Sequence, residues 1–223
     1  MRLTVFNGSP RGKKSNSKIV LDSFLEGFEA NAGNSYELFY LNRLKDTEDN
    51  VKAFAQAEHV LLIHPLYTDA MPGMVMNFFE GLKPLCDRMG NTDIGFIVQS
   101  GFGEAAHSRY VARYHQKLAT RLGCPYLGTV IKGNCEPLRK KPQSYRKVLE
   151  DFRHLGQAFG ETGRFDEALV HKLAGPEKFP AWMRLIIQLV PKIIGNPLWD
   201  DQLKENGVFD ERFAQPYVRT ADS

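Results

Sequence analysis

The sequence predicts an α/β fold in which one doubly wound sheet of five parallel strands is covered by helices on both faces. Short apolar runs rich in β-branched and aromatic residues recur at wide intervals along the first two thirds of the chain. Segments with helical spacing of apolar residues lie between these runs. A strand and a helix that alternate five times indicate parallel strands joined by right-handed crossovers.

The strand elements are the clearest part of this pattern. The first, third and fourth runs are nearly unbroken apolar sequences, as is typical of strands covered on both faces. The expected strands are LTVF (3–6), YELFYL (36–41), HVLLIH (59–64), IGFIV (94–98) and LGTVI (127–131).

The first expected helix carries one apolar stripe, and Ser17 or Asn16 could cap its start. Its stripe consists of Ile19, Leu21, Phe24, Leu25 and Phe28. The other expected helices cover about 47–57, 73–85, 105–122 and 144–159.

The rhythm of strands and helices stops after about Gly163. We therefore expect a domain over residues 1–163 and a C-terminal helical extension over residues 164–223, which packs on that domain or on a partner subunit. The extension holds one amphipathic stretch, WMRLIIQLVPKII, which Pro191 should kink or end. A helix lying on a membrane surface would need more basic residues than Arg184 and Lys192. A lid over the ligand site is the remaining alternative.

Composition limits the function classes. The 223 residues carry 29 basic and 26 acidic side chains, and a net charge of +3 is too balanced to indicate nucleic-acid binding. The three cysteines form no CxxC pair, which argues against a zinc cluster or a disulfide framework and favours a reducing, cytoplasmic setting. The start, MRLTVFNGSP, does not resemble a signal peptide, and no apolar stretch is long enough to span a bilayer.

Ligands of doubly wound sheets bind beyond the carboxyl ends of the strands. The loops expected there are 8–16, 65–73, 100–104 and 133–137. The first contains GSPRGKKSNS, which is typical of a phosphate-binding loop. It is one residue too short for a Walker loop, and no cysteine has the arginine spacing of a tyrosine phosphatase. The dinucleotide-like GFGEAA follows the wrong strand and has no acidic residue about twenty positions later.

The first loop can bind a phosphate monoester through hydroxyl and amide groups. Ser9, Ser15, Asn16 and Ser17 can donate hydrogen bonds through side chain or backbone, at the positive end of the following helix. Arg11 can add a charged hydrogen bond. The alternative is a serine- and lysine-rich turn that only caps a helix.

Three loops together resemble a known family. GSPRGKKSNSK resembles the GSPR-x-x-SNT loop of the flavodoxin-like NAD(P)H-dependent FMN reductases, a group that includes quinone and azo reductases. HPLYTDAMPGMVMNFFE resembles the P-x-Y segment of that family, and QSGFGE resembles its glycine-containing flavin loop. The resemblance covers residues 1 to about 160 and implies a flavodoxin-like sheet with strand order 2-1-3-4-5.

The resemblance also implies a cofactor site for FMN. The residues that would hold its phosphate are Ser9, Arg11, Ser15, Asn16 and Ser17. Those that would contact the isoalloxazine ring are Pro65, Leu66, Tyr67, Thr68 and Asp69 on one side and Ser100, Gly101 and Gly103 on the other. Asp69 departs from the tryptophan or glycine common in the family, and we expect its side chain to face solvent or to cap the turn before Met71.

The activity implied by the resemblance is transfer of hydride from NAD(P)H to flavin N5 and then to a quinone-like, flavin or other small acceptor. The flavin carries this chemistry, so neither a catalytic side chain nor a metal is expected. We expect a homodimer, because a single domain of this fold leaves its flavin edge open. Two other functions stay open: a non-enzymatic electron carrier, disfavoured by the pI of about 8.7, and a flavin-free binding protein on the same fold.

The remaining polar residues have ordinary structural interpretations. His64 could touch the flavin, although a hydrogen-bonded histidine at a strand end is the commoner arrangement. Arg109, Arg113 and Lys117 could meet a nicotinamide phosphate, but a solvated basic helix face is the simpler interpretation. No four-cysteine motif for an iron–sulfur cluster is present, and Cys135 is expected to be buried and inert.

Overall fold

The computed structural model describes residues 1–194 and 197–215, and it divides into two units. The first unit covers Met1–Lys178 and the second covers Phe179–Ser223. The first unit therefore continues beyond residue 163, where the repeating pattern of strands and helices ends. The reason is α6 (Glu167–Ala174), a helix that the sequence pattern does not indicate and that packs against β5 (Tyr126–Lys132).

The sheet has the five expected strands, all parallel, in the order β2-β1-β3-β4-β5, which confirms the flavodoxin-like topology. Each end of each strand lies within one residue of the expected position. The first four strands are β1 (Arg2–Asn7), β2 (Ser35–Tyr40), β3 (His59–Pro65) and β4 (Asp93–Gln99).

Five helices connect or follow these strands. They are α1 (Asn16–Glu29), α2 (Thr47–Ala55), α3 (Gly73–Gly81), α4 (Ala106–Leu122) and α5 (Arg146–Thr162). The N-cap of α1 is Ser15, whose Oγ accepts a hydrogen bond from Lys18 N, so the expectation that Ser17 or Asn16 caps this helix is wrong. The reason is that Ser15 keeps the extended backbone that an N-cap needs, whereas Asn16 and Ser17 are already helical.

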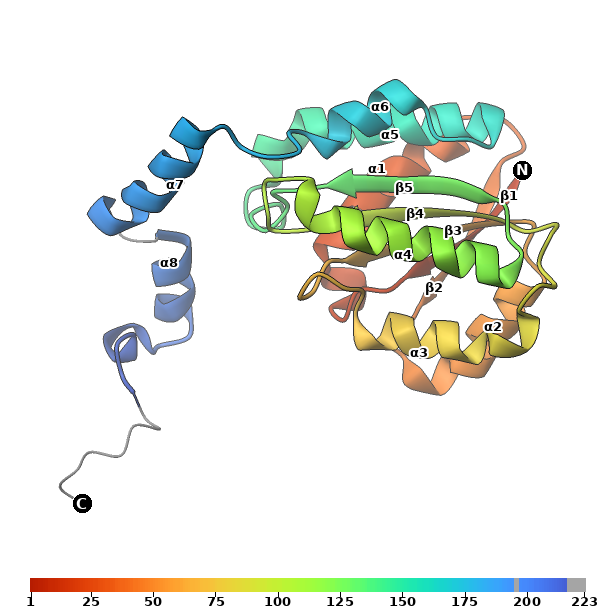
Figure 1. Ribbon diagram of the computed structural model, residues 1–223, viewed down its shortest axis with the longest axis horizontal. Helices are drawn as coiled ribbons and strands as arrows, with labels where there is room; N and C mark the ends of the chain where they lie inside the picture. Colours follow the sequence, from red (N-terminus) through yellow and green to blue (C-terminus); the bar gives the residue numbers. More distant parts are fainter. Residues whose placement is uncertain (195–196, 216–223) are drawn as a thin grey trace, which may run out of the picture. The chain divides into compact units, whose positions relative to one another are not determined.

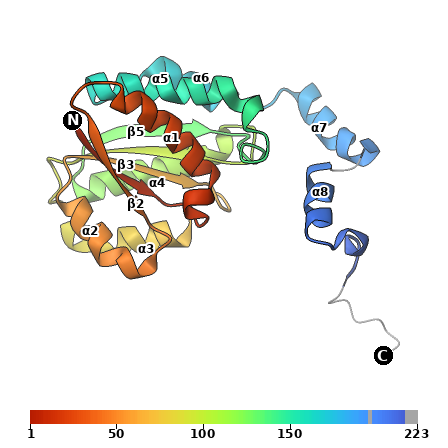
Figure 2. The same ribbon diagram turned by 180° about the vertical axis from the view of Figure 1, so that it is seen from behind.

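Helices α1 and α5 cover one face of the sheet, and α2, α3 and α4 cover the other (Figures 1 and 2). Successive strand residues point to opposite faces, so Leu61 and Ile63 of β3 join the core under α1 and α5, whereas Val60 and Leu62 join the other core. Both faces of the central strands are therefore buried, which explains their unbroken apolar sequences.

Two glycines allow α1 and α5 to cross in close contact. A Cβ atom on Gly27 would lie 1.8 Å from the carbonyl oxygen of Arg153, and one on Gly156 would lie 1.8 Å from that of Phe24. Neither site has room for any side chain. This contact fixes the position of α1, whose first residues face the ligand loops.

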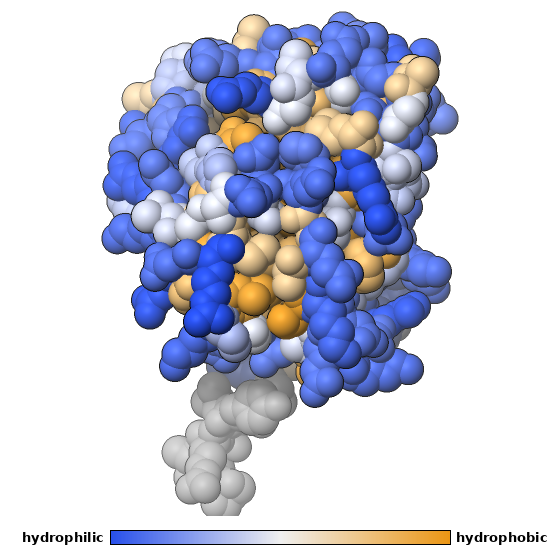
Figure 3. All heavy atoms as spheres, turned by 90° about the vertical axis from the view of Figure 1, so that its right-hand side faces the viewer, coloured by the Kyte–Doolittle hydropathy of each residue, from blue (hydrophilic) through white to orange (hydrophobic). Residues whose placement is uncertain are grey.

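The carboxyl ends of the strands lie on the left in Figure 1. Figure 3 shows the opposite side, at the amino ends of the strands, where hydrophilic side chains cover most of the surface around a smaller apolar area. The loops expected to bind a ligand are at the carboxyl ends.

The second unit contains α7 (Ala181–Ile194) and α8 (Pro197–Glu205). The amphipathic helix is present, but it continues through Pro191 to Ile194, so the expectation that Pro191 could end it is wrong. A proline removes one backbone donor without forcing a stop when flanking turns stay helical. The apolar side chains of Trp182, Leu185 and Leu189 are exposed. Among the described residues, no helix combines the length and apolar character that crossing a membrane requires.

Candidate functional site

The loops at the carboxyl ends of β1, β3, β4 and β5 meet around a small pocket of about 60 Å³. Most of the expected site residues line it, but Ser17, Thr68, Asp69 and Gly103 are not among its lining residues. The lining residues are Ser9, Arg11, Ser15, Asn16, Pro65, Leu66, Tyr67, Gln99, Ser100, Gly101 and Glu136. The sheet topology thus brings together four loops that are far apart in sequence.

Gln99 and Glu136 are the lining residues that sequence reasoning missed. Gln99 is the last residue of β4 and comes directly before Ser100, so its place beside the flavin loop could have been inferred. Glu136 lies in the loop after β5, a loop expected at the site without any residue being selected from it. Its carboxylate lies beside Gly101, where a Cβ atom would be 3.6 Å from Glu136 Cβ.

The loop after β1 is held by its own polar groups. Ser9 N donates to Asn7 Oδ1 at 3.0 Å, and Gly12 N donates to Ser9 O at 2.9 Å. Gly12 has a positive φ of 51°, a conformation that glycine adopts easily. Ser15 Oγ donates to Gly12 O at 2.7 Å while it caps α1. The loop is therefore preformed.

The start of α1 offers backbone donors to an anion. The N–H groups of Asn16 and Ser17, in the first turn, have no hydrogen-bond acceptor among the described residues. The positive end of the helix dipole favours negative charge there, and Arg11 lines the same pocket. The buried amide Nδ2 of Asn7, at the beginning of the loop, also has no partner among those residues. These unused donors fit a phosphate group.

The side chains of Asn16 and Ser17 have structural partners instead. Asn16 Nδ2 donates to Cys135 O at 2.7 Å, and Asn16 Oδ1 accepts from Arg139 N at 3.1 Å. Ser17 is fully buried, and its Oγ accepts a hydrogen bond from Gln99 Nε2 at 3.4 Å. The side chains thus hold the start of α1 to β4 and to the loop after β5, and the backbone amides of Asn16 and Ser17 are left for a ligand.

The loop after β3 forms a tight two-residue turn. Tyr67 and Ala70 exchange backbone hydrogen bonds of 2.9 and 3.0 Å, and the central residues Thr68 and Asp69 have φ values of 51° and 60°. Leu66 N donates to Gln99 O at 2.8 Å, which fastens the loop to β4. Tyr67 is 43% exposed, so its ring is accessible, and Asp69 is exposed at the tip of the turn.

The loops after β4 and β5 hold each other in place. Ser100 N donates to Lys132 O at 2.9 Å, and Cys135 N donates to Ser100 O at 2.7 Å. Gly133 is required here, because a Cβ atom on it would lie 2.3 Å from Phe102 O. Burial raises the pKa of the Cys135 thiol to about 12, so this thiol stays protonated and is a poor nucleophile.

Two other candidate contacts have structural partners. His64 is fully buried, and its two ring nitrogens form hydrogen bonds, Nδ1 with Pro65 O and Nε2 with the ring of His115. Arg109 forms an ion pair with Glu177, with 2.9 Å between Nη2 and the carboxylate oxygen.

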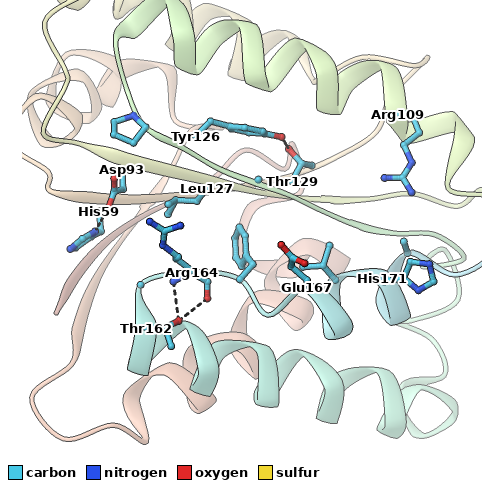
Figure 4. A pocket seen from close by; sticks show the side chains of 16 residues that line it. His59, Asp93, Arg109, Tyr126, Leu127, Thr129, Thr162, Arg164, Glu167 and His171 are labelled. Atoms are coloured by element: carbon cyan, nitrogen blue, oxygen red, sulfur yellow. Dashed lines mark hydrogen bonds and ion pairs between the residues drawn. The ribbon is translucent and has the colours of Figure 1, made fainter.

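A larger cavity of about 680 Å³ lies along β5, near α4 and α6, and shares no lining residue with the pocket at the strand ends (Figure 4).

The five-stranded order β2-β1-β3-β4-β5, with a pocket at the carboxyl ends of the strands and free backbone donors at the start of α1, defines a flavodoxin-like protein. The chain belongs to the NADPH-dependent FMN reductase family, which matches residues 1–134. It is therefore an NAD(P)H-dependent flavin oxidoreductase that uses FMN. A search of curated proteins finds no match.

Solved structures with the same fold share little sequence with this chain. An NAD(P)H:quinone oxidoreductase from Methanothermobacter marburgensis is 18% identical, with a TM-score of 0.58 over 71% of this chain and 96% of that one. An azoreductase from Bacillus anthracis str. Sterne is 14% identical, with a TM-score of 0.57 over 71% of this chain and all of that one. An NADH:FMN oxidoreductase (EMOB) is 10% identical, with a TM-score of 0.57 over 82% and 98% of the two chains. At these identities the likeness concerns the fold.

Proposed function

We propose that this protein passes hydride from a nicotinamide to a quinone-like, flavin or other small acceptor through FMN held at the carboxyl ends of the strands. Bound FMN supplies the hydride chemistry, which no protein side chain can provide. The observation that carries the proposal is the pair of unused N–H groups at Asn16 and Ser17, at the start of the helix whose first residue lines the pocket together with residues of three further loops.

The phosphate end of the site is formed by the loop after β1. The backbone N–H groups of Asn16 and Ser17 would donate to the phosphate, and Arg11 would add a charged hydrogen bond. Ser9 and Ser15 shape the loop around it. These contacts bind and orient the cofactor, so a change to them alters cofactor affinity more than the chemical step.

The ring end of the site is formed by the loops after β3 and β4. We assign Pro65, Leu66 and Tyr67 to one edge of the ring and Ser100 and Gly101 to the other. Thr68, Asp69 and Gly103 lie further out and extend these two loops. The Glu136 carboxylate beside Gly101 opposes negative charge, so it lowers the reduction potential of a ring bound there.

The open edge of the site favours a homodimer and small substrates. The exposed Tyr67 leaves one side of the pocket accessible to a nicotinamide and then to the acceptor. A second copy of the chain would cover the flavin edge that one domain leaves exposed. Three free cysteines suit a reducing, cytoplasmic setting. The description of the family favours NADPH as the hydride donor.

Anaerobic reduction by each nicotinamide tests the proposal. Purified protein loaded with FMN should lose its visible flavin absorbance on addition of NADPH or NADH, and a quinone, free flavin or azo dye should restore it. Parallel assays of the three acceptors identify the preferred class. Retention of flavin colour with both nicotinamides would overturn the enzyme function, and failure to bind added FMN would favour a binding protein.

A further inference from the structure

A chain of buried and partly buried hydrogen bonds runs from the loop after β3 to the cavity along β5. It begins at Pro65 O, which lies 2.8 Å from His64 Nδ1. His64 Nε2 lies 2.9 Å from His115 Nε2, on α4. His115 Nδ1 lies 3.1 Å from Thr129 Oγ1, which lies 2.7 Å from the hydroxyl of Tyr126. Tyr126 and Thr129 line the large cavity, where Figure 4 shows them next to each other on β5.

The carbonyl at one end, together with two neutral imidazoles, fixes the direction of every hydrogen bond. A carbonyl oxygen only accepts, so His64 Nδ1 carries a proton and donates to Pro65 O. A neutral His64 then has a lone pair on Nε2, so His115 donates from Nε2. His115 Nδ1 is left as an acceptor and receives the Thr129 hydroxyl proton. Thr129 Oγ1 in turn accepts from the Tyr126 hydroxyl, so every donor points toward the loop after β3.

Both imidazoles are held neutral by their surroundings. His64 and His115 are fully buried, and the His115 ring stacks on Phe96, with 4.0 Å between ring centroids and 6° between ring planes. Burial lowers the pKa of His64 to about 4, and burial next to His64 lowers the pKa of His115 as well. Protonation of His64 at Nε2 would place two N–H donors opposite each other across the 2.9 Å contact, and protonation of His115 at Nδ1 would oppose the Thr129 hydroxyl proton.

The Pro65 carbonyl belongs to the peptide that joins β3 to the loop after it. Leu66 N in the same peptide donates to Gln99 O, so the oxygen and the nitrogen of this peptide unit are fixed by different partners. Without the His64 donor, Pro65 O would be a buried carbonyl with one partner fewer, and the peptide could rotate. The backbone presented to a ring would then change.

We propose that His64 is a positioning residue for the Pro65–Tyr67 segment of the flavin site, and that His115 and Thr129 hold His64 in the tautomer that donates to Pro65 O. This inference rests on the proposed binding of FMN at that segment. It assigns a role to a buried histidine pair that has no contact with the pocket. The pair acts on cofactor binding through the backbone and not through a proton delivered to substrate.

Matched substitutions at position 64 test the positioning role. In His64→Asn the side-chain amide replaces the Nδ1 donor, whereas His64→Leu removes it. FMN affinity, measured by quenching of flavin fluorescence, should fall about 10-fold or more in His64→Leu and stay within about 3-fold of wild type in His64→Asn. The reduction potential of the bound flavin should shift only in the leucine variant. His154→Leu, at an exposed site on α5, controls for the substitution itself.

The outcomes separate this inference from the proposed function. Wild-type protein that does not bind FMN would overturn both, whereas normal FMN affinity and potential in His64→Leu would overturn only the positioning role. Thr129→Val removes the hydroxyl that donates to His115 Nδ1, and it should weaken FMN binding by a smaller factor than His64→Leu does. If the leucine variant does not fold, nitrogen-15 NMR of the wild-type histidines decides: His64 protonated at Nδ1 and His115 at Nε2 support the inference, and the reverse pattern overturns it.

Discussion

Asn16 donates a hydrogen bond from Nδ2 to the carbonyl oxygen of Cys135 across 119 positions of sequence, at a distance of 2.7 Å. The same side chain accepts from Arg139 N through Oδ1. One residue at the start of α1 thereby fixes the loop after β5, which carries Glu136 into the pocket. The loop after β1 and the loop after β5 are therefore one structural unit.

Asn16→Ala should destabilise the protein by about 1–3 kcal/mol, because it leaves a buried carbonyl without its donor. The measurement is the free energy of unfolding in urea. Asn42→Ala is the control, since the Asn42 side chain makes only an exposed hydrogen bond of 3.3 Å to Pro10 O. Its cost should stay within about 0.5 kcal/mol. An equal loss of unfolding free energy in the two variants would show that the Asn16 hydrogen bonds do not stabilise the protein.

The turn at Thr68 and Asp69 should be strained. Two-residue turns with positive φ at both central positions favour Asn-Gly, and a β-branched threonine is poorly suited to that conformation. The double substitution Thr68→Asn with Asp69→Gly should stabilise the protein by about 1–2 kcal/mol, as measured by urea unfolding. An unchanged or lower unfolding midpoint would show that Thr68 and Asp69 make compensating contacts.

Gly156→Ala should be strongly destabilising, because the added methyl group would overlap Phe24 O at 1.8 Å. Separating α1 from α5 should cost about 3 kcal/mol or more. Thermal unfolding measures the loss. Gly73→Ala, at the first residue of α3, is the control because a Cβ atom there meets nothing within 4 Å. A Gly156→Ala melting temperature as high as that of Gly73→Ala would contradict the packing described here.

Stability should fall as the pH drops below about 6.5, the ordinary pKa of histidine. The native state keeps the pKa of His64 near 4, so the unfolded state binds more protons in the window between these values. Above that window, neutral His64 makes its full contribution to the free energy of unfolding, which is on the order of 3 kcal/mol. The lowered pKa of His115 acts in the same direction. Urea unfolding across this window measures the slope, which should flatten in His64→Asn.

Most of the first unit could be predicted because its sequence pattern is local. The β-branched runs mark the strands, and the alternation with helices specifies parallel pairing. The N-cap was misplaced by one or two residues, because Ser15, Asn16 and Ser17 are all good caps and only the backbone shows which of them is extended. Helix α6 was missed because its eight residues are too few for a clear periodicity.

The loops of the site could be predicted from their places after strands, but their internal hydrogen bonds could not. Nothing near Asn16 in sequence indicates that its amide reaches Cys135, or that Ser17 turns inward to Gln99. The contact of His64 with His115 likewise joins residues 51 positions apart, on different elements. Such contacts depend on the tertiary arrangement and cannot be predicted from local sequence patterns.

The central claim is that backbone amides at the start of α1 bind the phosphate of FMN, and a comparison of FMN with riboflavin tests it most directly. Titration should give an affinity for FMN at least about 100-fold higher than for riboflavin, which lacks the phosphate. Arg11→Gln should reduce the ratio of FMN affinity to riboflavin affinity about 10-fold. Lys14→Gln removes the same charge outside the pocket lining and should leave this ratio unchanged. Equal affinities for FMN and riboflavin in the wild-type protein would contradict the account.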